Sequence, residues 1–314
     1  MAGFPSVLIV MCTYNGAPWL RAQLDSFAAQ DLKDWALVVS DDGSSDDTLD
    51  ILRTFAETYP VTIYEQRHGD HHLRPSQRAA RNYMQTLNRP DLPVGPDTYV
   101  ALSDQDDIWR ADKLSHAVAT LKQLKSPVAL YGGQSRHIRE DGTPIVFSRA
   151  PERAVGVHNA LVQNVVSGHS AVLTPAALTQ LRKAGAPSGI WYHDWWIYLL
   201  ISAVGGHIVV DDHVGLDYRQ HDTNLMGAGS GRTARRQRLH QVFNGEYGAW
   251  MRANLRALHA TSADLTPQAR TALSLLTPSS GPCLRLAALW RSGAYRQNPI
   301  DTLCIYIAGA THKL

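Results

Sequence analysis

Short apolar runs alternate with helix-length segments through the first half of the chain, and this alternation constrains the fold more than any other feature. Runs rich in Val, Ile and Leu predict strands at residues 7–11, 35–40, 61–64, 99–103 and 128–131. Apolar residues at helical spacing predict helices between them, at 20–28, 49–55, 77–87 and 113–124. This order predicts an α/β fold, a mostly parallel sheet with helices on both faces.

The second half continues the pattern less regularly. We expect a hairpin over 134–147 that turns at Asp141-Gly142, and shorter elements at 171–173, from 175, at 194–204 and at 207–210. The glycine-rich stretch 227–231 predicts a flexible joint, followed by a largely helical segment. The expected organisation is a catalytic α/β domain over 1–226 and a basic, mainly helical C-terminal extension over 227–314.

Charge is distributed unevenly along the chain. The segment from Arg232 onward holds eleven of the 30 Lys and Arg residues but three of the 28 acidic residues, within a net charge of +2. A basic tail on an acidic body indicates a polyanionic partner such as an anionic membrane, a lipid diphosphate or nucleic acid; the alternative is a solvated helical surface. The apolar pattern Leu286, Leu289, Trp290 beside Arg285 and Arg291 favours a membrane-surface helix, or else packing against the catalytic domain or a second subunit.

The cellular setting follows from two weaker signals. The three cysteines lack CxxC spacing, which argues against a disulfide framework or a zinc site and suits a reducing cytosol. No run approaches the roughly 20 apolar residues that span a bilayer. We therefore expect a cytoplasmic protein, with its tail as a candidate for peripheral contact with the inner face of the membrane.

Three polar clusters follow predicted strands, at 13–15, 41–44 and 103–107. In open α/β sheets the ligand lies at the carboxyl ends of the strands. The last cluster places Asp104, Asp106 and Asp107 together, and crowded carboxylates indicate a divalent cation, whose usual companion is a phosphate. The alternative is a solvated turn whose last Asp caps the next helix.

Five motifs occur in one order: VSDDGSSDDT, ALSDQDDIW, HNALVQNVVSG, HDWW and YRQHDTN. Over residues 5–227 this order resembles family 2 glycosyltransferases of the GT-A fold. The wording SDQDDIW, HNALVQN and YRQH is most similar to bacterial rhamnosyltransferases that assemble surface polysaccharides. No GxGxxG follows the first predicted strand, so a dinucleotide-binding site is not indicated.

The resemblance implies a role for each matching residue. Asp106 and His221 would hold Mn²⁺ or Mg²⁺, with Asp104 facing the ribose or the metal. The remaining residues expected to bind the nucleotide sugar are Thr13, Tyr14, Asn15, Asp41, Asp42, Arg81, Gln105 and Arg219.

Asp194 matches the catalytic base, which takes the proton from the acceptor hydroxyl. Many family members carry Glu-Asp where this chain has His193-Asp194, so the role of His193 is open. Asp194 also suits a helix N-cap, and the two roles are compatible. Trp191, His193 and Trp195 are candidates for the acceptor site, where an aromatic ring can stack on a sugar.

These roles predict an inverting, metal-dependent transferase that moves a sugar, L-rhamnose from dTDP-rhamnose by subfamily resemblance, to a hydroxyl of a polysaccharide or lipid-linked glycan. The expected partners are this donor and acceptor, and no nucleic acid. One alternative is a nucleotidyltransferase acting on sugar phosphates, which would usually show an early Gly-rich loop with Lys or Arg. The other is an inactive glycan-binding module, which predicts loss of the carboxylates that this chain keeps.

Overall fold

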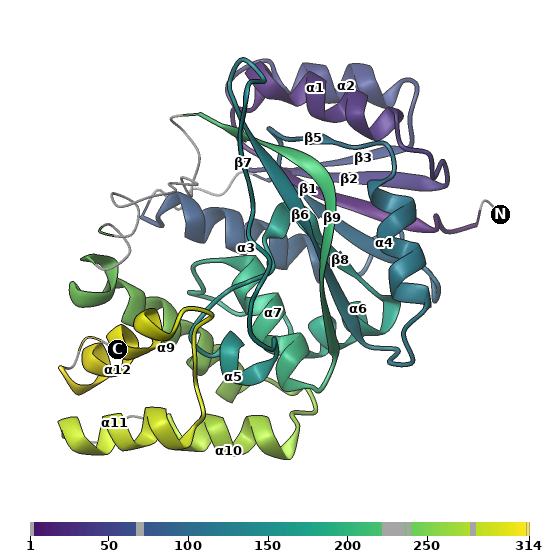
Figure 1. Cartoon of the computed structure of the whole chain (residues 1–314). Coiled ribbons are helices and arrows are strands. Elements are labelled where there is room, and N and C mark those ends of the chain that lie inside the picture. The colour runs from purple at the N-terminus through teal and green to yellow at the C-terminus, as the bar shows by residue number, and fades with distance from the viewer. Residues whose placement is uncertain are drawn as a thin grey trace.

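A computed structural model describes residues 3–66, 72–221, 236, 240–276, 281–311 and 313 of the chain. Within these residues nine strands form one sheet in the order β3-β2-β1-β4-β8-β6-β9-β5, with β7 paired to β6 (Figure 1). Parallel ladders hold most of the paired residues. The predicted α/β fold with a mostly parallel sheet is therefore confirmed.

The first half of the sheet matches its prediction closely. Its parallel strands are β1 (Val7–Thr13), β2 (Trp35–Asp41), β3 (Val61–Glu65) and β4 (Tyr99–Ser103). The intervening helices are α1 (Ala17–Ala28), α2 (Thr48–Ala56), α3 (Pro75–Leu87) and α4 (Lys113–Lys122). The carboxyl ends of β1, β2 and β4 lie side by side, because β1 pairs in parallel with both neighbours.

The second half brings in antiparallel pairs. The strand β8 (Ala171–Leu173) runs antiparallel between β4 and β6 (Ala129–Arg139), and β6 is parallel to β9 (His207–Gln220). The predicted hairpin is formed by β6 and β7 (Pro144–Phe147) and turns through Gly142 at φ +85°. Two-residue β5 (Ile108–Trp109) pairs with β9.

Helices cover both faces of the sheet because the central strands are apolar on both sides. Along β1, Ile9 and Met11 pack with α1, α2 and α4, whereas Leu8 and Val10 face α3, α6 (Pro175–Ala184) and α7 (His193–Ala203). Alternate residues of a strand point to opposite faces, so one strand serves two cores.

The C-terminal helices gather on one side of the molecule, near α5 (Val157–Ala160) and α7 (Figure 1). They are α9 (Glu246–Ala260), α10 (Pro267–Leu275), α11 (Pro282–Arg291) and α12 (Pro299–Ala310). Tyr247 and Trp250 of α9 join the buried cluster that contains Trp195 of α7, and the Tyr247 hydroxyl donates to the Val162 carbonyl at 2.6 Å. At least α9 therefore packs on the catalytic half.

The expected joint at 227–231 and the boundary between 226 and 227 lie outside the described residues, so the domain division stays a prediction. Among the helices that the structure describes, none has the length and apolar character needed to cross a membrane.

Candidate active site

Three loops meet at the carboxyl ends of β1, β2 and β4, and hydrogen bonds tie them together. The Gln105 side chain accepts from the Tyr14 amide at 2.9 Å and donates to the Tyr14 carbonyl at 3.2 Å. The Asn15 amide donates to Ser44 Oγ, and Asn15 Oδ1 accepts from the Ser45 amide, both at 2.8 Å. The polar clusters at 13–15, 41–44 and 103–107 thus lie together at one edge of the sheet.

The two carboxylates at the end of β2 differ in their surroundings. Asp41 is fully buried and accepts four hydrogen bonds, from the Thr13 hydroxyl, the Gly43 amide, and the Ser44 amide and hydroxyl. These bonds occupy both of its oxygens as well as the Thr13 hydroxyl. Asp41 and Thr13 therefore hold the turn together, and the nucleotide-binding role expected of both stays a prediction.

Asp42 keeps an oxygen available. Its Oδ2 accepts from Arg78 Nε at 2.9 Å and forms an ion pair with Nη2 at 2.6 Å, while its buried Oδ1 has no hydrogen-bond partner in the described part of the chain. The Arg78 guanidinium also lies over the ring of exposed Tyr14, 4.5 Å from its centre. A buried acceptor beside an exposed ring suits a nucleobase, which offers an N–H edge and a flat face.

Arg78 was not among the residues predicted to bind the nucleotide sugar, whereas Arg81 was. Both lie on α3 one turn apart, and Arg81 is half-buried. The signal that could have separated them is the reach from α3 to the DDGS turn, which a sequence alone does not give.

The predicted metal pair is brought together across 115 residues of sequence. His221 Nε2 lies 2.8 Å from Asp106 Oδ2, and both side chains are largely buried. Trp19 stacks on the His221 ring with centres 5.0 Å apart. Arg219 donates from Nε to the Asp106 carbonyl and from Nη1 to the Glu140 carbonyl, which fixes it beside the same loop.

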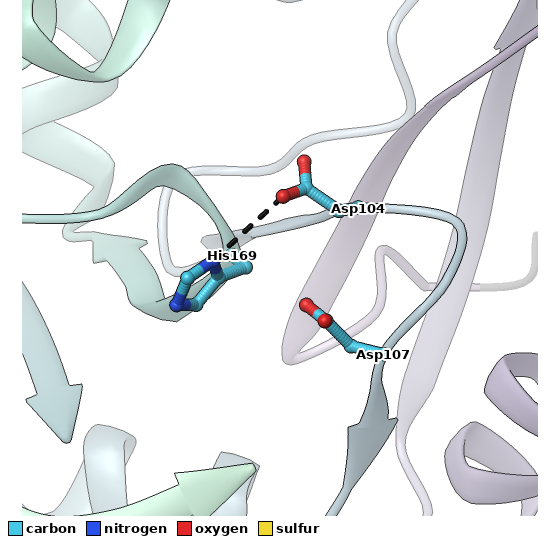
Figure 2. Close-up of side chains that lie close together, drawn as sticks. All are labelled: Asp104, Asp107 and His169. Atoms are coloured by element: carbon cyan, nitrogen blue, oxygen red, sulfur yellow. Dashed lines mark ion pairs between the residues drawn. The ribbon is translucent and has the colours of Figure 1, made fainter. Parts of the chain in front are cut away.

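A second group of possible ligands adjoins the first. One oxygen or nitrogen from each of Asp104, Asp107 and His169 lies within 4.8 Å of the others, and Figure 2 shows the three side chains converging. His169 Nδ1 is 3.7 Å from Asp104 Oδ2. His169 was missed from the sequence, although it follows directly on the HNALVQNVVSG motif.

The pKa values of the two carboxylates in this group shift in opposite directions. Asp107 is fully buried, and neither of its oxygens accepts a hydrogen bond from a described residue. Burial, with the nearby charges of Asp106 and Asp104, raises the pKa of Asp107 well above its ordinary value. For Asp104 burial also acts upward, but hydrogen bonding and attraction to His169 hold its pKa below the ordinary value.

Buried carboxylate oxygens without donors, close to further carboxylates and two imidazoles, fit a divalent cation in chemistry. Lys113 also reaches this corner: its buried Nζ donates to the His169 carbonyl at 3.1 Å and lies over the Trp109 ring. Burial lowers the pKa of Lys113 to about 7, against the pull of Asp107 and Asp104. The lysine is thus a weak source of compensating charge.

Asp194 stands in the first turn of α7, as its sequence position predicts. Its Oδ2 accepts from the Gly168 amide at 3.1 Å and its Oδ1 from the Trp195 amide at 2.7 Å. Residue 168 is glycine because a Cβ there would lie 2.6 Å from His193 Nε2. Gly168 directly precedes His169, whose ring lies near Asp104. The hydrogen bond from Gly168 therefore links Asp194 to the neighbourhood of Asp104.

His193 links the two sides a second time. Its ring stacks on Tyr83 with centres 3.9 Å apart, and burial lowers its pKa despite the nearby Asp194 and Asp104. The Tyr83 hydroxyl donates to the Ser103 carbonyl and lies 3.5 Å from Asp104 Oδ1. His193 therefore packs on Tyr83, the residue that lies beside Asp104, and the acceptor role expected of His193 stays a prediction.

The two tryptophans differ in exposure. Trp195 is only 3% exposed, and its Nε1 donates to the Ala160 carbonyl at 2.7 Å. Its burial leaves no face for a sugar, so the expected acceptor role does not fit Trp195. Trp191 is half-buried, near Trp250 and under the Arg74 guanidinium. Of the two tryptophans, Trp191 is therefore the one for which an acceptor role stays a prediction.

Comparison with known proteins finds similarity to one family of enzymes. A family model described as "Glycosyl transferase family 2" matches residues 8–152, which contain the first two of the five motifs. Residues 8–152 carry the glycosyltransferase family 2 domain. The chain is 27% identical to the dTDP-rhamnosyl transferase RfbG of Shigella flexneri over 81% of this chain and 85% of that protein.

Solved structures agree with the predicted GT-A fold. The mannosyltransferase PcManGT from Pyrobaculum calidifontis, in complex with GDP-Man and Mn²⁺, has a TM-score of 0.53 at 21% identity, covering 99% of this chain and 87% of that one. Residues 1–349 of S. aureus TarS, in complex with UDP-GlcNAc, give 0.52 at 15% identity, with 98% and 91% covered.

Proposed function

We propose that this family 2 glycosyltransferase is an inverting, metal-dependent enzyme that transfers L-rhamnose from dTDP-rhamnose to a hydroxyl of a polysaccharide or lipid-linked glycan. One observation carries the proposal: Asp194 hydrogen-bonds to Gly168, and the next residue, His169, lies 3.7 Å from Asp104. A general base and the acidic loop of the donor site thus share one small region. Transfer by direct displacement requires that proximity.

The donor would bind along the loop ends. Asp42 Oδ1 would accept the N–H of a pyrimidine, Tyr14 would stack on the ring, and Arg78 holds both residues in place. Asp104, which is partly exposed and whose pKa lies below its ordinary value, would accept from the ribose hydroxyls. Asn15 and Gln105 fix the loops through backbone contacts, so they position the nucleotide without reaching it.

The metal would be held by Asp106 and His221, with Asp104 as a further neighbour. A divalent cation there, Mn²⁺ or Mg²⁺, would neutralise the charge that develops on the departing diphosphate. A neighbour in fold is in complex with Mn²⁺, and the mixed carboxylate and imidazole set leans toward that ion.

Asp194 would take the proton from the acceptor hydroxyl as the oxygen attacks the anomeric carbon. The bonds from the Gly168 and Trp195 amides hold its carboxylate at the start of α7. A single displacement inverts the anomeric centre, by the stereochemical logic that also governs glycosidases.

Asp104, Asp107 and His169 are a second candidate metal site, favoured by the Asp107 oxygens, which accept no hydrogen bond from the described residues. The two sites differ in which neighbouring aspartate binds, so Asp106 and Asp107 can be tested separately. The donor sugar rests on the likeness to RfbG, a dTDP-rhamnosyl transferase.

The test is a donor panel. The chain is incubated with dTDP-rhamnose, UDP-GlcNAc, GDP-mannose and UDP-glucose, each with Mn²⁺, Mg²⁺ or EDTA, and binding is measured by calorimetry. We expect dTDP-rhamnose to bind best and EDTA to weaken binding. Equal binding of every donor would contradict the assignment of rhamnose as the donor sugar. Equal binding in EDTA would contradict the metal dependence. If no donor binds under any condition, the entire proposal is contradicted.

A further inference from the structure

The two last helices, α11 and α12, expose an unusual amount of apolar surface. The side chains concerned are Leu284, Leu286 and Trp290 on α11, and Ile300, Leu303 and Ile307 on α12. Trp290 is 72% exposed and Leu303 58%. Scattered exposed apolar residues are normal, but a group of six on two contacting helices marks an interaction surface.

The other side of the pair is already occupied. Leu289 and Ile305 are buried, the Ser292 carbonyl contacts His158 Nδ1 at 2.7 Å, and the Tyr295 carbonyl accepts from Asn159 at 3.0 Å. These contacts fix the segment between the helices against α5. The exposed apolar residues therefore lie outside the contacts that hold these helices on the rest of the molecule.

The pattern on α12 separates the two surfaces. Ile300, Leu303 and Ile307 recur at i, i+3 and i+7, which places them on one stripe of the helix. The helix carries one charged residue, Asp301, among its twelve. A helix that is apolar all round is normally buried, so its exposed stripe indicates a missing apolar partner.

The charged residues near this apolar surface indicate what kind of partner it binds. Arg285 and Arg291 belong to α11 and Lys313 follows α12, whereas Asp301 is the one acidic residue from 281 to the end. Apolar side chains with basic residues beside them match the boundary between acyl chains and anionic headgroups, and an exposed tryptophan is favoured there. Neither helix is long enough to cross a bilayer, so contact would be along the surface.

We propose that α11 and α12 form a docking surface for an anionic lipid bilayer, into which Trp290, Leu303 and their neighbours insert while Arg291 and Lys313 contact the headgroups. This surface is separate from the sugar-transfer site, and the inference holds whichever donor the enzyme uses.

The experiment is flotation of the full chain with phosphatidylcholine vesicles, with and without phosphatidylglycerol. We expect binding to the anionic vesicles only, and weaker binding as salt is raised. The double variant Trp290→Ser, Leu303→Ser should lower the vesicle partition coefficient by about tenfold or more, because each large side chain withdrawn from water contributes on that order.

The matched control is Phe147→Ser on β7, a 54% exposed aromatic outside this surface, which should leave binding unchanged. Quenching by brominated lipids gives a second readout that needs no destabilising change: the unsubstituted chain should be quenched, and Trp290→Phe should lose that part of the signal.

Three results would overturn the proposal. They are no binding of the unsubstituted chain to anionic vesicles, equal loss in the Phe147 control, or a double variant that dissociates a dimer in sedimentation while its vesicle binding is unchanged. The last result would assign the surface to a second copy of the chain. None of them depends on sugar transfer, so they are distinguishable from a failure of the proposed function.

Discussion

Replacing Asp194 with asparagine tests the proposed chemistry most directly. The substitution removes a charge and the ability to accept a proton while it keeps the size of the side chain. A positioned general base contributes about 10² to 10⁴ in rate. At about 1.36 kcal/mol per tenfold, the transition state should lose roughly 3 to 5.5 kcal/mol of stabilisation.

The structural cost of the same change is smaller. Asp194 accepts from two amides, at Gly168 and Trp195, and asparagine keeps one acceptor oxygen for them. At the other amide, the asparagine NH₂ group would face a backbone N–H, so one hydrogen bond is lost and two donors oppose each other. This loss should lower the free energy of unfolding by about 1 to 3 kcal/mol. Loss of the carboxylate from the first turn of α7 adds roughly 0.5 kcal/mol. Against a typical stability of about 5 to 15 kcal/mol, most of the variant should remain folded.

The assay separates binding from chemistry. Donor affinity by calorimetry should change by less than about threefold, whereas the release of nucleoside diphosphate in the presence of acceptor should fall by at least about 10². Asp50→Asn is the matched control, because it removes a carboxylate from the first turn of α2, where Asp50 makes an exposed ion pair with Arg53. This control should retain full transfer.

Two outcomes would refute the reasoning. Transfer by Asp194→Asn within tenfold of the unsubstituted chain would show that Asp194 is not the base. A raised KM for donor with unchanged kcat would show that Asp194 contributes uniform binding instead.

Three further predictions concern neighbouring groups. Asp42→Asn should weaken donor binding by about tenfold, whereas Asp41→Asn should lower Tm by roughly 4 to 8 °C, a loss of about 2 kcal/mol, because Asp41 holds its turn by four hydrogen bonds; calorimetry and thermal denaturation check the pair. Asp106→Asn should abolish the Mn²⁺ dependence of nucleotide binding and Asp107→Asn should not; the reverse result would move the metal to the site of Asp107. Burial raises the pKa of Tyr192 to about 12, so with rising pH its phenol ionises in the unfolded chain before it ionises in the folded one. The stabilisation from the neutral phenol is complete below about pH 10 and is lost between about pH 10 and 12. Denaturant melts of Tyr192→Phe across this pH range should lack that part of the loss.

The sequence predicted best where apolar runs are bounded by polar turns. The strands at 99–103 and 171–173 were predicted to the residue. By contrast, β9 extends ten residues beyond its predicted end at 210, through a stretch that includes Asp211 and Asp212. Its pairing with β6 shifts register after Val210 and resumes at Val214, which keeps the strand in the sheet, and no local pattern reports such a long-range pairing.

The site shows the same division between local and long-range information. The match of Asp106 with His221 came from motif order, and the fold places them 2.8 Å apart. The contrast between Asp41 and Asp42 was invisible because adjacent residues of a strand end point in opposite directions. Arg78 and His169 were missed because their partners lie on other elements, 36 and 65 residues away in sequence.

The loops of this site are fixed mainly by one another. Gln105 is bonded to Tyr14 across 91 residues, Asn15 to Ser44 across 29, and Asp194 to Gly168 across 26. Each bond joins the ends of different elements, so it exists only once the sheet has brought those ends together. A donor would then meet groups whose conformational entropy was already lost in folding, which lowers the cost of binding and of reaching the transition state. That arrangement explains why Gln105 and Asn15, which the family resemblance assigns to the nucleotide, make their contacts with backbone: the same residue types in these motifs are needed to position the loops.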